Sequence, residues 1–164
     1  MTDYTDITLI EMAWRNAMLS YEELLVADKG GNVLHHVVGT SIRIILPDNV
    51  RSILRDKIVS HYHPSIATAR LHREKCDNPL SYTDMATAFQ HFVYEVRAVC
   101  DNYIYSFKPK VPLTPYSLHE TIVRNNFTEW DDDLQWEETL IGLAALTGSC
   151  YEKIPIGGEQ NGNN

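Results

Sequence analysis

The sequence predicts one α/β domain in which helices pack on a β-sheet. Residues 6–19 carry apolar side chains at helical spacing, which predicts an amphipathic helix lying on the sheet, with Trp14 in the core. Short apolar runs bounded by turn residues follow, as is typical of strands. A second helical stripe, 81–94, leads into two further short apolar runs. With 164 residues, the chain is long enough for one domain with a sizeable core.

The first helix begins at Asp6 or at Thr8, since Thr8 and Glu11 have the spacing of a capping box. Turn residues then divide the sheet into strands, because glycine and asparagine adopt turn conformations at little cost. The segments expected to be strands are 22–27, 33–38, 40–46, 57–61, 96–100 and 103–107. We expect the first three to form an antiparallel meander and the last two a hairpin.

Between the strands, Pro47 opens a short helix that runs through Leu54, with Ile53 and Leu54 as inward candidates. Residues 65–80 have no clear period and are predicted to be a loop, although 66–75 could be a short helix. A loop of this length inside a compact domain is usually functional or mobile.

The C-terminal third begins with three prolines that interrupt the chain, at positions 109, 112 and 115. Two helices are expected after them, at about 115–125 and 129–146. We therefore predict a core domain over 1–108, a helical extension packed on it over 109–150, and a flexible polar tail over 151–164.

The composition limits the classes of function. A net charge of −8 argues against sequence-independent binding to duplex DNA, which requires clustered Lys and Arg. The acidic charge is compatible with a protein or peptide partner. No apolar run approaches the roughly 18 residues of a membrane span, and the polar N-terminus is not a secretory signal. The three cysteines are odd in number and widely spaced, which favours reduced thiols in a cytosolic protein.

The residues that suggest chemistry gather around the end of the predicted strand 57–61. Side chains two apart in an extended chain point the same way, so His61 and His63 present two imidazoles on one side. Asp84 lies in the first turn of the next helix. Two histidines and one carboxylate, with one coordination position left open, form the ligand set of a catalytic zinc site.

A zinc hydrolase also needs a general base near the attacking water. Glu22 opens the first predicted strand, and strand alternation puts Glu22 and Glu23 on opposite faces, so only one of them faces the metal. We take Glu22. Ser81 could stabilise the oxyanion of a tetrahedral intermediate. Ser81 and Asp84 also have the spacing of an ordinary capping box, which leaves a purely structural role open.

The order of these motifs resembles the JAMM (JAB/MPN-type) metalloenzymes, whose signature is a distant Glu, then His-x-His-Pro, then Ser-x-x-Asp. The matching residues here are Glu22, His61, His63, Pro64, Ser81 and Asp84. The resemblance is closest to small prokaryotic and phage JAB-like domains, including RadC-like proteins. It implies a mixed, curved sheet sandwiched by helices in a layout like that of cytidine deaminases, with the C-terminal helices as an addition.

The same resemblance implies a zinc ion held by His61, His63 and Asp84, with Glu22 as general acid and base and Ser81 as the oxyanion partner. It also implies hydrolysis of a peptide or isopeptide bond, since characterised members often cleave next to the C-terminal glycines of ubiquitin-like proteins.

Residues 64–80 make the spacer between the histidines and Ser81 longer than is usual in this family, so they could serve as a substrate flap or cover the site. Two alternatives follow. One is a catalytically inactive JAB-like scaffold or regulatory binding module, associated with phage or defence. The other is a metal-dependent phosphoesterase or nuclease, which the shortage of clustered Lys and Arg disfavours.

Overall fold

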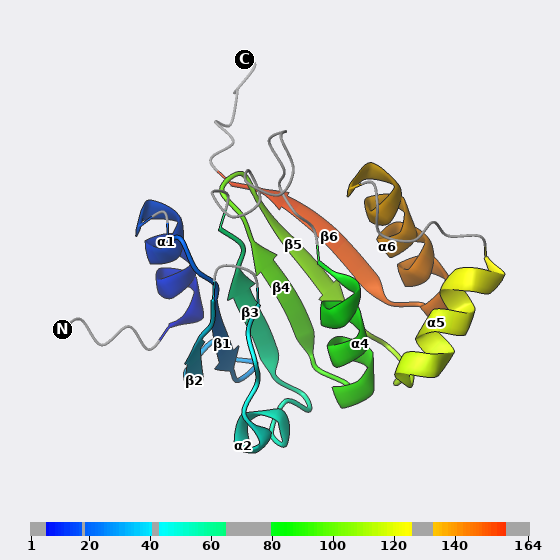
Figure 1. Cartoon of the computed structure of the whole chain (residues 1–164), viewed down its shortest axis with the longest axis horizontal. Helices are drawn as coiled ribbons and strands as arrows, with labels where there is room; N and C mark the ends of the chain where they lie inside the picture. The colour runs from blue at the N-terminus through cyan, green and yellow to red at the C-terminus, as the bar shows by residue number, and fades with distance from the viewer. Residues whose placement is uncertain (1–5, 18, 41–42, 65–79, 126–132, 157–164) are drawn as a thin grey trace, which may run out of the picture.

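The computed structural model describes residues 6–17, 19–40, 43–64, 80–125 and 133–156, and of 133–135 the backbone only. In these residues a six-stranded mixed sheet is flanked by helices on both faces (Figure 1), which confirms the predicted α/β class. The strands are β1 (Glu23–Ala27), β2 (Val33–Val38), β3 (Ile58–Tyr62), β4 (Glu95–Val99), β5 (Tyr103–Lys108) and β6 (Cys150–Pro155). The helices are α1 (Ile7–Ala17), α2 (Asp48–Arg51), α4 (Tyr82–His91), α5 (Pro115–Arg124) and α6 (Asp133–Thr147).

The strand order is β2-β1-β3-β4-β5-β6. Strands β3 and β4 pair in parallel, and each of the other neighbouring pairs is antiparallel. A parallel pair needs a crossover connection, and here the crossover contains α4. Because the helix returns antiparallel to the strands, its N-terminus lies near the carboxyl end of β3. Ligand sites of open α/β sheets favour this kind of edge.

Helix α1 covers one face of the sheet. Ile7 and Trp14 pack there against a small apolar cluster that includes Leu25, Tyr62 and Val99. This confirms the predicted amphipathic helix and the core position of Trp14, which is 3% exposed. The helix is capped by Asp6, whose carboxylate accepts a hydrogen bond from the Thr8 amide at 2.8 Å. Of the two predicted starts, the structure therefore selects Asp6.

The other face carries the larger core, which α4, α5 and α6 cover together. Phe89 of α4 packs edge-on against Phe107 of β5, with ring centroids 5.5 Å apart. Leu118 of α5 and Leu140 of α6 are fully buried in the same cluster. The predicted helix 115–125 is confirmed by α5. The predicted start of the following helix lies outside the described residues, and within them α6 begins at Asp133.

The predicted strand over 40–46 is wrong in its described part, since Thr40 and residues 43–46 form no strand. The amide and hydroxyl of Thr40 both donate hydrogen bonds to the Arg43 carbonyl, at 2.9 and 3.2 Å. These hydrogen bonds use backbone groups that a sheet ladder would need. Ile44 and Leu46 instead pack, half-buried, against the larger core.

The predicted flexible tail is also wrong over its first residues, because Cys150–Pro155 forms the edge strand β6. β6 pairs with β5 along its whole length. Glu137 of α6 accepts hydrogen bonds from Tyr151 and Lys153, which links the strand to the helix before it. Residues 157–164 of the predicted tail lie outside the described residues, as do 65–79 of the predicted loop.

Two predicted helices end earlier than expected. α4 ends at His91, because Phe92 adopts a left-handed conformation with φ of 50° and the Val93 amide bonds back to the Ala88 carbonyl. α2 ends at Arg51, and Leu54 beyond it is buried as predicted, whereas Ile53 is only half-buried.

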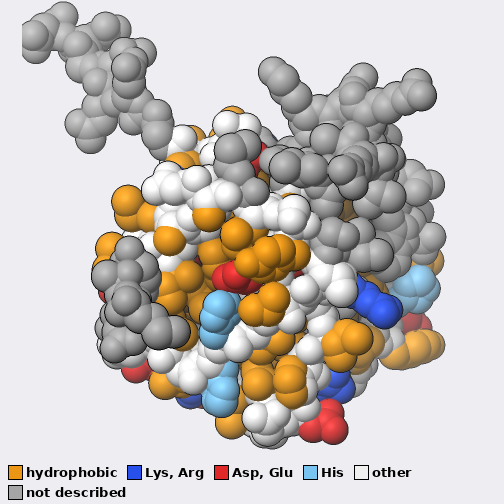
Figure 2. Space-filling model, turned by 60° about the vertical axis from the view of Figure 1, so that its left-hand side comes forward, with side chains coloured by type: hydrophobic (Ala, Val, Ile, Leu, Met, Phe, Trp, Pro, Cys, Tyr) orange, Lys and Arg blue, Asp and Glu red, His pale blue; other side chains and the backbone are white. Residues whose placement is uncertain are grey.

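The two edge strands differ in their side chains. β2 exposes Leu34 and Val38, which are 45% and 61% exposed. Figure 2 brings this side of the molecule forward and shows many hydrophobic side chains on its surface. β6 also exposes an apolar side chain, Ile154 at 44%, but its neighbours Glu152, Lys153 and Pro155 are exposed as well. No helix in the described part of the chain has the length and apolar character needed to cross a membrane.

Candidate metal centre

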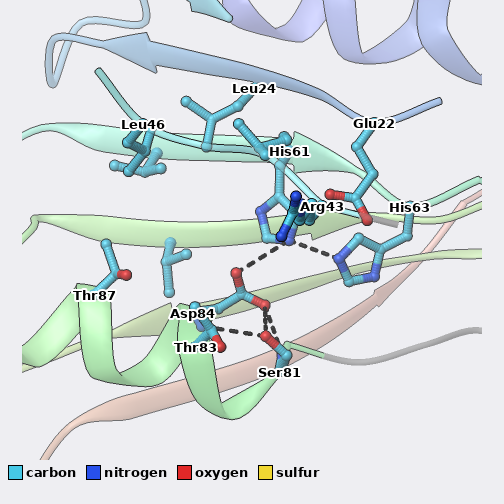
Figure 3. A pocket seen from close by; sticks show the side chains of 13 residues that line it. Glu22, Leu24, Arg43, Leu46, His61, His63, Ser81, Thr83, Asp84 and Thr87 are labelled. Atoms are coloured by element: carbon cyan, nitrogen blue, oxygen red, sulfur yellow. Dashed lines mark hydrogen bonds and ion pairs between the residues drawn. The ribbon is translucent and has the colours of Figure 1, made fainter. Parts of the chain in front are cut away.

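The two histidines of the candidate centre lie at the carboxyl end of β3. His61 is inside the strand, and His63 follows it, with its amide still bonded to the Val99 carbonyl of β4 at 3.0 Å. This bond keeps the chain extended one residue beyond the strand, so both imidazoles point to the same side. Their Nε2 atoms are 2.7 Å apart (Figure 3).

Asp84 comes from the first turn of α4, and a complete capping box fixes it there. The Ser81 hydroxyl accepts a hydrogen bond from the Asp84 amide, and the Asp84 carboxylate accepts one from the Ser81 amide at 2.6 Å. The Ser81 hydroxyl also donates to the same carboxylate oxygen, Oδ2, at 2.7 Å. The other oxygen, Oδ1, is left to face His61, 3.4 Å from Nε2.

The donor atoms of His61, His63 and Asp84 all lie within 4.8 Å of one another. Zinc bonds of about 2.0–2.2 Å in a tetrahedral site place neighbouring donors about 3.4 Å apart, close to the observed His61–Asp84 separation. The two imidazole nitrogens lie closer than that and would separate slightly around an ion. Two imidazoles and a carboxylate are donors that zinc accepts, so these residues fit the ion.

The adjacent glutamates lie on opposite faces of the sheet, as strand alternation predicts. Glu22 lines the same pocket as the three candidate ligands. Glu23 points to the α1 face, where its carboxylate accepts a hydrogen bond from the Trp14 indole and lies 2.8 Å from His36 Nε2. The structure thus brings Glu22, and not Glu23, to the candidate centre.

Charge coupling sets the protonation of these groups. Burial opposes ionisation of Asp84, but His61 and the Ser81 hydrogen bond outweigh it and hold the pKa of this carboxyl far below its usual range. Burial lowers the pKa of His61, but the Asp84 and Glu22 carboxylates and a hydrogen bond with the Arg97 backbone leave it raised overall.

Burial also raises the pKa of Glu22. The positive charge of His61 lowers this pKa and the negative charge of Asp84 raises it, and the net shift is upward. Glu22 is therefore a stronger base than an ordinary exposed carboxylate, while Asp84 remains ionised. The two carboxyl groups of the pocket are thereby divided into a proton acceptor and a permanently charged ligand candidate.

Ser81 lines the pocket as predicted, but its single hydroxyl proton is directed at Asp84. In this arrangement the hydroxyl orients the carboxylate, as groups behind metal ligands commonly do. Its predicted role as an oxyanion partner requires the hydroxyl to turn away from Asp84 and stays a prediction.

The pocket has a volume of about 280 Å³, and one of its walls is apolar. The apolar wall consists of Leu24, Ile44, Leu46, Val59 and Val96. Sequence reasoning missed Arg43, which also lines the pocket, because it was assigned to a strand that does not form. The only feature of the local sequence that could have indicated this was Gly39, the glycine that precedes residues 40–46.

The centre therefore combines three metal donors, a basic carboxylate and an apolar wall that could hold a side chain. Such a combination can bind a cation, accept a proton from water and position an uncharged group beside both. Comparisons of this chain with family models, with curated proteins and with solved structures found no match.

Proposed function

We propose that this protein is a cytosolic zinc-dependent hydrolase of peptide or isopeptide bonds, of the JAMM type. The observation that carries the proposal is the convergence of Glu22, His61, His63 and Asp84 on one pocket. These residues come from three separate segments, the residue before β1, the carboxyl end of β3 and the first turn of α4, yet they occur in the order of the motif that the sequence resembles. The substrates are proteins or peptides, and ubiquitin-like proteins are one class to test.

In this proposal His61, His63 and Asp84 would hold the metal. Zinc, when bound, supplies a Lewis acid and makes water more acidic. Glu22 accepts the proton of the attacking water and then returns it to the leaving amine, a role that its raised pKa favours. Ser81 keeps Asp84 oriented through its amide and hydroxyl. The apolar wall excludes bulk water from one side of the reacting bond.

Metal content is the first test. Protein purified without a metal-affinity tag should contain about one zinc per chain by elemental analysis, in line with three protein ligands and one open position. The His61→Ala/His63→Ala protein should contain none. His35→Ala/His36→Ala is the matched control, because this pair lies on β2, away from the pocket, and should leave zinc bound. Wild-type protein that takes up no zinc would refute the proposal.

Peptide cleavage is the second test, and the two adjacent glutamates provide a variant and its control. Glu22→Gln should reduce cleavage of peptide and isopeptide substrates by at least about 100-fold, the usual contribution of a general base, with zinc still bound. Glu23→Gln changes the same charge on the opposite face and should cleave at the wild-type rate. Zinc binding with no amide hydrolysis by the wild type would favour the scaffold or regulatory alternative.

A further inference from the structure

Arg43 is the only Lys or Arg among the described residues that line the metal pocket. Within the described part of the chain its guanidinium makes no hydrogen bond and no ion pair. Figure 3 shows Arg43 together with the other side chains that line this pocket. The centre thus contains a cationic group whose hydrogen-bond donors are available to a ligand.

The backbone holds Arg43 in this position through a short series of hydrogen bonds that begins at Glu22. The Glu22 amide donates to the Thr40 carbonyl, and the Gly39 amide donates to the Glu22 carbonyl, each at 2.8 Å. Thr40 in turn donates to the Arg43 carbonyl through its amide and its hydroxyl. The arginine is therefore tied to the same backbone segment that carries the candidate general base.

Gly39 makes this arrangement possible because the chain passes very close to itself at this point. A Cβ atom on Gly39 would lie 2.6 Å from the Arg43 carbonyl oxygen and 2.6 Å from Cγ1 of Ile44. Any other residue would force the segment away from the pocket. The close approach and the hydrogen bonds together show that the position of Arg43 is built into the fold.

The charges of the pocket indicate which ligand the arginine would take. Asp84 is already engaged by His61 and Ser81, and Glu22 lines the pocket without an ion pair to Arg43, so no carboxylate of the described residues pairs with this arginine. A guanidinium matches the geometry of a carboxylate with two parallel hydrogen bonds, which an ammonium group cannot do. The volume of about 280 Å³ is small for a ligand pocket and suits one or two residues of a peptide.

We propose that Arg43 binds a carboxylate of the substrate beside the amide bond that is cleaved, while the apolar wall holds a neighbouring aliphatic side chain. This inference rests on the proposed hydrolase function and names its substrate class, peptides with a carboxylate next to the scissile bond. The carboxylate comes either from the C-terminus of the peptide or from an Asp or Glu side chain.

Two pairs of short peptides separate these sources. Their binding is followed by NMR titration of the chain of residues 1–164, first as purified and then after zinc chelation. N-acetyl-Leu-Gly with a free C-terminus is compared with its C-terminal amide, and N-acetyl-Leu-Asp-amide with N-acetyl-Leu-Asn-amide. We expect at least one carboxylate peptide to bind about tenfold more tightly than its neutral partner, before and after chelation.

In Arg43→Gln this preference should disappear, and in Arg43→Lys it should be reduced, because lysine keeps the charge but loses the planar fork. Arg124→Gln, on the exposed surface of α5, removes the same charge elsewhere and should keep the preference. Equal binding of acid and amide by the wild type, or a preference that survives in Arg43→Gln, would overturn the inference. The same spectra report cleavage of the peptides, so a failure of hydrolysis and a failure of carboxylate binding are separate results.

Discussion

The capping box of α4 serves the helix and the candidate metal centre with the same hydrogen bonds. Ser81 uses Oδ2 of Asp84 for the cap, and this leaves Oδ1 oriented toward His61. Loss of a hydrogen bond that orients a metal ligand typically weakens metal binding by about 10-fold to 100-fold. A change at Ser81 should therefore affect two separate properties, helix stability and zinc affinity.

Ser81→Ala should lower the free energy of unfolding by about 1 kcal/mol through loss of the cap. It should also weaken zinc binding by about 10-fold to 100-fold, because Asp84 loses a partner. Thr114→Ala is the matched control, since Thr114 caps α5 through the Ser117 amide and lies outside the pocket. Urea unfolding and competition with a coloured chelator measure the two effects. Equal zinc affinities in the two variants would contradict the prediction.

Zinc affinity should fall as the pH is lowered from 8 to 6. Zinc needs an unprotonated imidazole, and the Asp84 and Glu22 carboxylates raise the pKa of His61 above its usual 6.5, so protons compete already near neutral pH. Asp84 stays ionised throughout, because its pKa is strongly lowered. Chelator competition should show about a tenfold loss per pH unit for one displaced proton. An affinity that stays constant over this range would argue against His61 as a ligand.

Several of these positions follow from local rules. The alternation of side chains along a strand is enough to place Glu22 and Glu23 on opposite faces of the sheet. The two-residue spacing of His61 and His63 likewise places both imidazoles on one side. Arg43 could not be found in this way. Its position depends on the close approach at Gly39 and on hydrogen bonds to Glu22, which are contacts between separate segments.

Among the elements, α1 is joined to the sheet by a buried charged network as well as by apolar contacts. The Glu11 carboxylate accepts a hydrogen bond from Ser60 at 2.6 Å and pairs with Arg97 of β4. Arg97 also pairs with Glu95 at 2.8 Å, and Ser106 of β5 donates to the same carboxylate. One guanidinium thus serves two carboxylates that are almost inaccessible to solvent.

Arg97→Ala should lower the free energy of unfolding by about 3 kcal/mol at pH 7, because two buried carboxylates lose their counter-charge. The loss should be smaller near pH 4. Without Arg97 the folded-state pKa values of Glu11 and Glu95 rise. At neutral pH the folded variant then binds more protons than the unfolded chain, so its free energy of unfolding falls as the pH increases. Denaturant unfolding at both pH values tests this. Arg124→Ala, which breaks an exposed pair with Glu120, should cost at most about 0.5 kcal/mol.

Elements with strong periodicity were predictable, and those that depend on partners were not. The stripes of α1 and α4 and the hairpin of β4 and β5 follow from spacing and turn residues. β6 was missed because Cys150–Pro155 is polar and largely exposed, so only its pairing with β5 makes it a strand. Residues 40–46 have strand-like composition, yet the Thr40 amide and the Arg43 carbonyl bond to each other and not to a neighbouring strand.

At the scale of the whole molecule, zinc should stabilise the fold, because its ligands come from β3 and α4 and converge only in the folded chain. With free zinc at 100 times its dissociation constant, the midpoint of thermal unfolding should rise by about 5–10 °C. Scanning fluorimetry with and without a chelator measures the shift. His61→Ala/His63→Ala should show none, and a shift of the same size in this variant would place the ion elsewhere.

The unequal edges of the sheet have a consequence for the solubility of the protein. An open edge strand with apolar side chains is a template for pairing with a second chain, and β2 has Leu34 and Val38 exposed along it. β6 is protected by Glu152 and Lys153 and by Pro155, which has no amide proton to donate. In concentrated solution β2 is therefore the edge at which chains would begin to aggregate. A lysine in place of Val38 is the substitution best placed to prevent it.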